Sequence, residues 1–542
     1  MAARVKPVTS WRRPGPVSSV GLGLALGLLG LAGAAIGALL LAAGQGPAIV
    51  EGYILHVALF TLTQAVLSTG LSLALALPVA RACWRRAVSW RIGWLLPFCF
   101  LPVVMPTTVA ATGLIGVWGQ NGFVSDLSRH LGLDGLPAIY GLGGVLLAHV
   151  FFNAPLMLRV LAGALASVPP SQWRLSAQWG LSGWDRFRLI EWPALRPVIP
   201  GLLALVFLLC FTSFSLILML GGGPAVTTLE VSIYTALRFD FNMVLAGRLA
   251  LLQLVICGLV VVALTHLTGR SWAASPRHAY HAPLQKGDDS FMSRGGDAIM
   301  LVTFAVIALL PLLTIVLNGI GPHILTVASW PSFHRSALTS ILIALASGCL
   351  ATGFAFVLAA ARTRRRIATM AVWPLDLSIS LYLAVSAIVL GTGLFILLRQ
   401  VADVFVLAPF LVMIGNMLIA LPFAYRVLEG RLAAIAAAHD RLCAGLGIRG
   451  WRRLRLITLP AIAPELGFAA GLSAALSLGD MTVIALFGSQ QFQTLPWLLY
   501  QTMARYRAGE AAALSLWLLG LTLILFIGFT MASKSLGRRR NA

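Results

Sequence analysis

The chain has 542 residues, of which 59% are hydrophobic and only 10% are charged, and its mean hydropathy is +0.91. A soluble domain carries about 25% charged residues, so this composition excludes an ordinary soluble protein. The net charge of +22 comes almost entirely from arginine, which stands between apolar stretches and not along one basic face. We therefore expect an all-α membrane protein that lies in a lipid bilayer and binds no nucleic acid. The six cysteines show no C-x-x-C spacing, so we expect no metal site.

Twelve stretches are apolar and long enough to cross a membrane, which takes about 20 residues in a helix. They are expected at 20–43, 54–80, 93–117, 137–161, 198–220, 244–267, 298–319, 337–361, 370–398, 404–426, 464–487 and 510–533. The first is too long for the core of a signal peptide, so residues 1–53 are expected to hold an N-terminal tail and the first spanning helix. Arginine runs at 85–86, 364–366 and 538–540 predict that both termini are cytoplasmic, as is the polar linker 271–297.

An internal repeat divides the chain. Pro155 and Arg159 recur as Pro422 and Arg426, a shift of 267 residues, and a shift of 279 residues aligns the arginine pairs at 85–86 and 364–365. We expect two homologous halves of six helices each: the first spanning helix followed by a transmembrane domain at 54–270, and a second transmembrane domain at 298–542 with its core at 335–530. Because six is an even number, both halves run in the same direction through the membrane, related by a pseudo-twofold axis.

The best-matched segments are two expected cytoplasmic loops, 170–193 and 437–460. Loops usually vary unless they carry function. In the first loop, Pro170 is expected to open a helix and Gly180 to allow a turn. Trp184, Phe187 and Ile190 then predict one apolar face of a short amphipathic helix, which Pro193 is expected to end.

The spacing of these loops resembles the EAA loop of ABC-importer permeases, in which a glycine is followed after nine residues by Ile-x-Leu-Pro. In that family the loop forms the coupling helix that docks on an ATPase subunit. The resemblance implies coupling to an ATPase through Gly180, Trp184, Arg186, Arg188, Ile190, Pro193, Gly447, Trp451, Arg453, Arg455, Ile457 and Pro460. Arg174 and Arg441 stand where the family has glutamate, so any contact made by that glutamate is in doubt here.

Further segments resemble the permeases of thiamine and thiamine pyrophosphate importers. They are Gly119–Gly122, Leu147–Asn153, Gly221–Glu230 and Ser477–Pro496. This resemblance implies a type I importer fold in a bacterial inner membrane, with a periplasmic thiamine-binding protein and a homodimer of ATP-binding cassette subunits as partners. Fused ferric-iron permeases share the two-half layout and remain the alternative.

The energy source must lie on a partner. A P-loop requires Gly-Lys followed by Ser or Thr, and the residues before Lys6, Lys286 and Lys534 are not glycine. We therefore expect no enzyme activity and no cofactor in this chain, with ATP-Mg bound by the partner subunit. An ion-coupled secondary transporter is less favoured, because only Asp376 and Asp480 lie within clear apolar stretches, with no evident basic partner.

Asp480 is the first candidate for the translocation pathway. A carboxylate within the membrane should face the protein interior or a water-filled path, so it could assist a cationic thiazolium. A structural hydrogen bond or a contact between the halves is the equal alternative. Ser213, its equivalent in the repeat, and Asp376 are weaker candidates.

Overall fold

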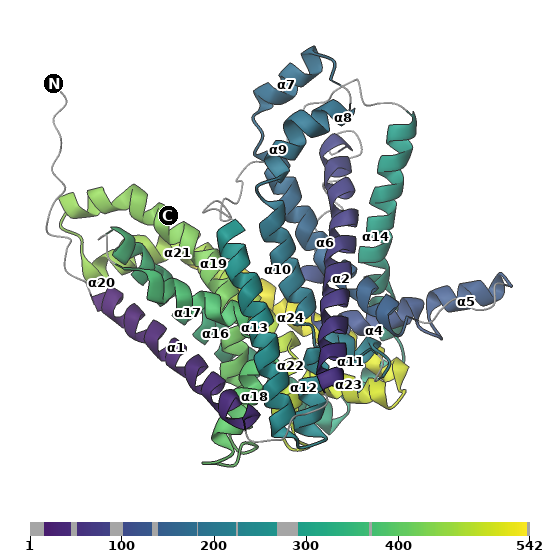
Figure 1. Cartoon of the computed structure of the whole chain (residues 1–542). Coiled ribbons are helices and arrows are strands. Elements are labelled where there is room, and N and C mark those ends of the chain that lie inside the picture. Colours follow the sequence, from purple (N-terminus) through teal and green to yellow (C-terminus); the bar gives the residue numbers. More distant parts are fainter. Residues whose placement is uncertain are drawn as a thin grey trace, which may run out of the picture. The chain divides into compact units, whose positions relative to one another are not determined.

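The structure is a computed structural model. It describes residues 16–44, 51–86, 101–132, 139–181, 183–223, 226–267, 291–367 and 371–538. Every secondary-structure element in these ranges is a helix, which confirms the all-α class (Figure 1). Within the same ranges, nine helices are long and apolar enough to span a membrane, and two further helix pairs pass the same test but are bent.

The nine continuous candidates include helices from both halves. They are α1 (Pro16–Ala43), α2 (Glu51–Arg86), α6 (Leu142–Ala166), α13 (Met243–Leu267), α14 (Phe291–Gly319), α16 (Pro331–Ile367), α19 (Ala408–Gly445), the run from α20 (Gly450–Arg453) through α21 (Leu459–Gly479) to α22 (Thr482–Phe487), and α24 (Ala508–Arg538). Shorter helices connect them. These are α4 (Thr107–Trp118), α5 (Phe123–His130), α7 (Pro170–Gln178), α11 (Ser215–Leu220), α12 (Leu229–Arg238), α15 (His323–Ala328) and α23 (Leu495–Ala504).

The expected span at 93–117 has no continuous counterpart among the described residues. Its described part holds a short 3-10 helix, Leu101–Val104, and then α4, with 12 residues, whereas residues 93–100 lie outside the described ranges. The other eleven expected spans fall on the nine continuous helices or on the bent pairs. A total of twelve spans therefore stays a prediction.

A single helix over 370–398 is wrong. Two helices, α17 (Trp373–Ala384) and α18 (Ala387–Leu398), meet there at an angle of 97°. The Ser386 hydroxyl accepts a hydrogen bond from the backbone N–H of Val389, which caps the start of α18. A serine in this position favours a new helix start, and this is the physical reason for the break.

The expected spans 198–220 and 464–487 each contain an interruption of the helix, although the run Gly450–Phe487 still counts as one candidate span. The first is divided into α10 (Ile199–Phe211) and α11, and the second into α21 and α22. The two breaks fall at Ser213 and Asp480, which are equivalent in the repeat. A broken helix within a membrane protein leaves carbonyl groups that other parts of the protein must satisfy.

An amide side chain bonds one carbonyl next to each break. The Nε2 atom of Gln64 donates to the carbonyl of Cys210 at 3.0 Å, and the Nδ2 atom of Asn416 donates to the carbonyl of Ser477 at 3.2 Å. Cys210 and Ser477 are equivalent in the repeat, but Gln64 lies on α2 whereas Asn416 lies on α19. The same backbone requirement is thus met from different helices in the two halves.

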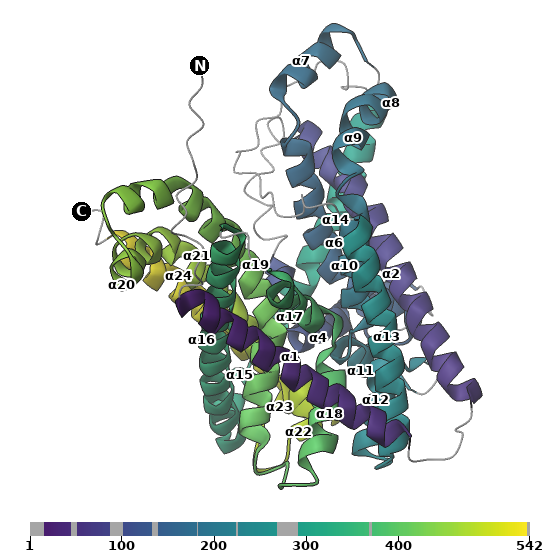
Figure 2. The ribbon, with the colours of Figure 1, turned by 60° about the vertical axis from the view of Figure 1, so that its left-hand side comes forward.

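The chain packs into two compact units, each considered by itself. One comprises residues 1–44, 338–492 and 521–542; in it α19 packs along α21, and α1 packs against α17 and α18 (Figure 2). The other comprises residues 45–337 and 493–520; in it α2 packs along α6, and α14 packs against α2 and α4.

The first helix of each half therefore packs with helices from the other half of the sequence. A Cβ atom on Gly393 of α18 would lie 2.6 Å from the carbonyl oxygen of Ala35 on α1, and one on Gly113 of α4 would lie 2.7 Å from that of Pro311 on α14. Small residues allow such close approach of membrane helices. The two compact units therefore do not coincide with the two domains predicted from the repeat, 54–270 and 298–542. That division into domains stays a prediction.

Candidate functional site

The first loop, 170–193, contains the predicted helix and turn. Helix α7 begins at Pro170, since proline fits the first turn of a helix. Gly180 has a φ of +61°, which confirms the turn at this glycine. Three helical segments then follow without a gap: α8 (Gly183–Arg186), a π-helical segment (Phe187–Glu191) and α9 (Trp192–Leu195).

The second loop, 437–460, has the same course with one difference. Helix α19 continues into it up to Gly445, because alanines 436 and 437 stand where the first loop has prolines 169 and 170. Gly447 has a φ of +67°, close to that of Gly180. After it come α20, a π-helical segment (Leu454–Thr458) and α21.

The prediction that Pro193 ends the helix is wrong. Pro193 and its equivalent Pro460 lie in the first turn of a helix that continues from the π-helical segment before it. A proline ring clashes with the carbonyl four residues earlier in an α-helix, and a π-helical turn, bonded over five residues, removes that contact. In the first loop the helix therefore continues to Leu195 and is then bent by 63° before α10, whereas in the second loop it continues through α21 to Gly479.

Burial in the two loops also differs from the predicted amphipathic face. Trp184 and Trp451 are 68% and 71% exposed, whereas Arg186 and Arg453 are only 4% and 6% exposed. Ile190 and Ile457 are half-buried, and Arg188 and Arg455 are exposed. The side chain that each loop buries most deeply at these positions is thus an arginine, and a tryptophan faces outward.

The two loops present the same kind of surface. Its large apolar side chains are exposed at four equivalent pairs of positions: Leu175 and Leu442, Trp179 and Leu446, Trp184 and Trp451, Leu189 and Leu456. Exposed arginines accompany them, namely Arg174, Arg188, Arg441 and Arg455. Exposed apolar side chains beside positive charges are typical of a surface that binds another protein.

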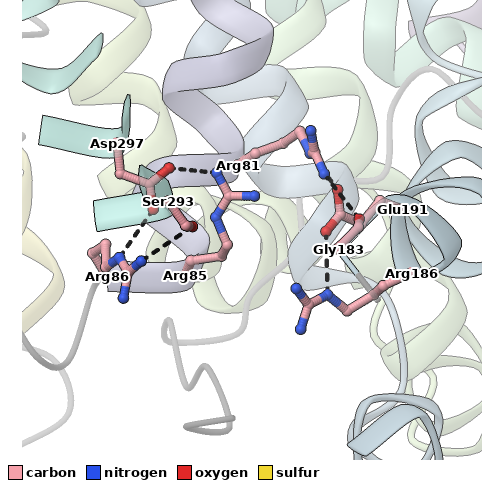
Figure 3. A network of polar contacts seen from close by, with 8 residues as sticks. All are labelled: Arg81, Arg85, Arg86, Gly183, Arg186, Glu191, Ser293 and Asp297. Carbon is pink, nitrogen blue, oxygen red and sulfur yellow. Dashed lines mark hydrogen bonds and ion pairs between the residues drawn. The ribbon is translucent and has the colours of Figure 1, made fainter. Parts of the chain in front are cut away.

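A polar network fastens the first loop to the end of α2 (Figure 3). The Nε atom of Arg81 donates to Oε2 of Glu191 at 2.5 Å, and Arg186 Nε lies 3.8 Å from Oε1 of the same carboxylate. Arg81 also donates to the carbonyl of Gly183 at 3.5 Å, and its guanidinium lies 4.4 Å from the ring centre of Phe187. One buried carboxylate thus holds the loop and α2 together.

The same end of α2 is bound to α14 (Figure 3). Arg86 Nε donates to Oδ2 of Asp297 at 2.9 Å, and Arg85 pairs with the other oxygen of that carboxylate. Ser18 of α1 stands at the equivalent position in the other half, and Arg365 donates to its hydroxyl at 3.4 Å. The second helix of each half is thus bonded to the first helix of the other half, and a carboxylate takes part in only one of the two contacts.

The second loop has its own ion pair, between a buried arginine and a half-buried aspartate. Arg453 pairs with Asp440, which lies in the last part of α19. Neither Asp440 nor Glu191 was predicted, because a single acidic residue among many arginines in a loop carries no distinguishing spacing. The repeat aligns Arg186 with Arg453 but not the two carboxylates, so it did not indicate them either.

The predicted pathway residues have structural partners. Asp480 accepts hydrogen bonds from the backbone N–H groups of Thr482 at 3.2 Å and Val483 at 3.0 Å, so it satisfies the first turn of α22. Asp376 forms an ion pair with Arg362, which corrects the expectation that it lacks a basic partner. Ser213 lies at the break between α10 and α11.

Comparison with known proteins places these features in a family. Residues 68–271 match the family described as "Binding-protein-dependent transport system inner membrane component". This is a class of membrane proteins that work with a separate binding protein.

Curated relatives extend the similarity over almost the whole chain. The thiamine transport system permease protein ThiP of Brucella abortus (strain 2308) is 40% identical over 96% of both chains. Those of Salmonella typhimurium and Haemophilus influenzae are 40% and 36% identical over 90% and 88% of both chains. A ferric transport system permease protein from Haemophilus influenzae is 28% identical over 41% of this chain. The chain belongs to the family of binding-protein-dependent inner-membrane permeases that the ThiP proteins represent.

Proposed function

We propose that this chain is the permease subunit of an ATP-driven importer that carries thiamine, thiamine pyrophosphate or both across the inner membrane. The observation that supports this most strongly is its 40% identity to ThiP over 96% of both chains. Similarity to the ferric transport permease is lower and covers 41% of this chain, so thiamine is favoured over iron as cargo.

Each of the two loops, 170–193 and 437–460, docks on one subunit of an ATPase homodimer in this proposal. The four equivalent pairs of exposed apolar side chains support it, because they offer the same kind of surface twice to a twofold partner. Arg174 and Arg441, which replace the family glutamate, favour an acidic surface on that partner.

The membrane arrangement follows from the same proposal. The loops and both termini lie on the cytoplasmic side, and a periplasmic thiamine-binding protein delivers the cargo from outside. ATP-Mg is bound by the ATPase subunits, since this sequence contains no Gly-Lys pair of a P-loop. ATP binding closes the ATPase pair, the loops move with it, and the pathway alternates between inward-open and outward-open states.

Uptake by cells tests the proposal. Cells that lack their own thiamine importer would carry this chain together with the ATPase and binding protein encoded for it, and would receive radiolabelled thiamine or ferric iron. We expect thiamine uptake that ATP depletion abolishes and that an uncoupler leaves unchanged when ATP is held constant. Uptake of iron alone would overturn the cargo, and uptake that follows the proton gradient would overturn the energy source.

A further inference from the structure

The buried arginine of each loop occupies the same place in the repeat, but its carboxylate partner does not. Arg186 and Arg453 are equivalent, whereas the position of Glu191 is held by Thr458 in the second loop. Conversely, the position of Asp440 is held by Trp173 in the first loop. The pairing is thus kept while the residue that provides the negative charge has moved to the other side of the arginine in sequence.

We propose that Glu191 and Asp440 are positioning residues for transport, each of which holds the coupling helix of its loop rigidly on the helices behind it. This inference rests on the proposed function, in which the loops receive movement from the ATPase. A loop that is loosely attached would still bind the ATPase through its exposed side chains, but would pass on less of the movement.

In the first loop the attachment runs to α2. Glu191 is 1% exposed and contacts both Arg186 of the loop and Arg81 of α2. Arg81 adds its bond to the carbonyl of Gly183 and its contact with the ring of Phe187. Three contacts of Arg81 therefore connect the end of α2 with both ends of the segment from Gly183 to Glu191, and the contact between Glu191 and Arg186 lies within that segment.

In the second loop the attachment runs to α19. Asp440 precedes the turn at Gly447, and Arg453 follows it, so their ion pair closes the turn. The position equivalent to Arg81 is Ala360, which offers no charge to a carboxylate at position 458. Arg364 of α16 adds a positive charge near both Asp440 and Arg453. A buried arginine needs a partner, and losing it leaves an uncompensated charge that destabilises this arrangement strongly.

The test compares transport with ATP hydrolysis in the complete complex of this chain, its ATPase and its binding protein, reconstituted in lipid vesicles. We expect Asp440→Asn to lower thiamine import per ATP hydrolysed by more than about tenfold while hydrolysis continues. The charge-swapped double variant D440R/R453D again joins the end of α19 to the segment after the turn through an ion pair, and we expect much of the import per ATP to return. Asp126→Asn, which breaks an exposed ion pair with Arg129 on α5, is the matched control and should change nothing.

A second variant guards against loss of folding. D440N/R453Q removes both charges, so no buried charge is left unpaired, and we expect a folded complex with poor import per ATP. Full import by this variant, unchanged import by D440N, or a failure of the charge-swapped variant D440R/R453D to restore any import would each overturn the inference. If the unmodified complex imports no thiamine, the proposed function fails instead, and the two failures are thereby distinguished.

Discussion

The turn at Gly447 gives the sharpest test of the loops, because its cost can be derived from one backbone angle. Its φ of +67° lies in the left-handed region, which costs a residue other than glycine about 1–2 kcal/mol. A Cβ atom on Gly447 would meet no atom within 4 Å, so an alanine there would suffer from the backbone angle and not from a collision. Gly447→Ala should therefore lower the equilibrium ratio of native to non-native turn conformations about 5- to 30-fold.

The matched control lies two residues earlier. Gly445 ends α19 with helical backbone, and a Cβ atom on it would also meet nothing within 4 Å. Gly445→Ala should therefore leave the turn intact, since alanine favours a helix more than glycine does. Gly447→Asn should fall between the two, because asparagine enters the left-handed region more readily than other residues.

The assay is ATP-dependent uptake of radiolabelled thiamine, divided by the amount of permease in the membrane. Gly447→Ala combined with the same change at Gly180, whose φ is +61°, should cost about 2–4 kcal/mol, because distant sites add. Equal uptake by the Gly445 and Gly447 alanine variants would refute the reasoning, since it would show that the left-handed turn does not matter for transport.

Three further predictions concern the helices behind the loops. Gly393→Ala should lower the melting temperature of the purified protein, because its Cβ atom would lie 2.6 Å from the backbone of α1 and such overpacking costs about 1–3 kcal/mol. Gly37→Ala on α1, where a Cβ atom meets nothing within 4 Å, is the control and should leave the melting temperature unchanged. Asn416→Leu should lower the free energy of unfolding by about 1–3 kcal/mol, because the carbonyl of Ser477 loses its side-chain donor. An unchanged denaturation midpoint would contradict this prediction. Asp480→Asn should keep uptake, since asparagine also caps a helix, and lost uptake at full expression would instead support an electrostatic role.

Much of the fold could be predicted from apolar stretches and the repeat, but the breaks within the stretches could not. The window around Ser213 is as apolar as an unbroken span, so hydropathy predicts a single helix there. The break depends on tertiary partners such as Gln64 on α2, which bonds the carbonyl of Cys210. Such a partner is far away in sequence, and no local pattern indicates it.

The loops show a similar limit. The positive φ of Gly180 and Gly447 could be predicted, because glycine at a turn between two helical patterns has a direct conformational reason. The burial of Arg186 could not, since sequence rules place charged side chains outside unless a partner is known. Glu191, the partner, gave no sign in the sequence that it was one.

Equivalent positions in the two halves need the same kind of partner, but different residues provide it. A carbonyl beside a helix break needs a donor, and the donor comes from α2 in one half and α19 in the other. A buried arginine in each loop needs a carboxylate, which comes from Glu191 in the first loop and Asp440 in the second.

A fused chain makes such exchanges possible. In a homodimer both loops would have the same sequence, so a carboxylate moved in one loop would move in the other. In the first loop, Trp173 stands at the position of Asp440, and the centre of its ring lies 5.4 Å from that of Trp84. An apolar contact in the first loop thus takes the place of the charged residue in the second. The first loop can then direct its carboxylate to Arg81, and the two loops become attached to different helices while their exposed surfaces stay alike.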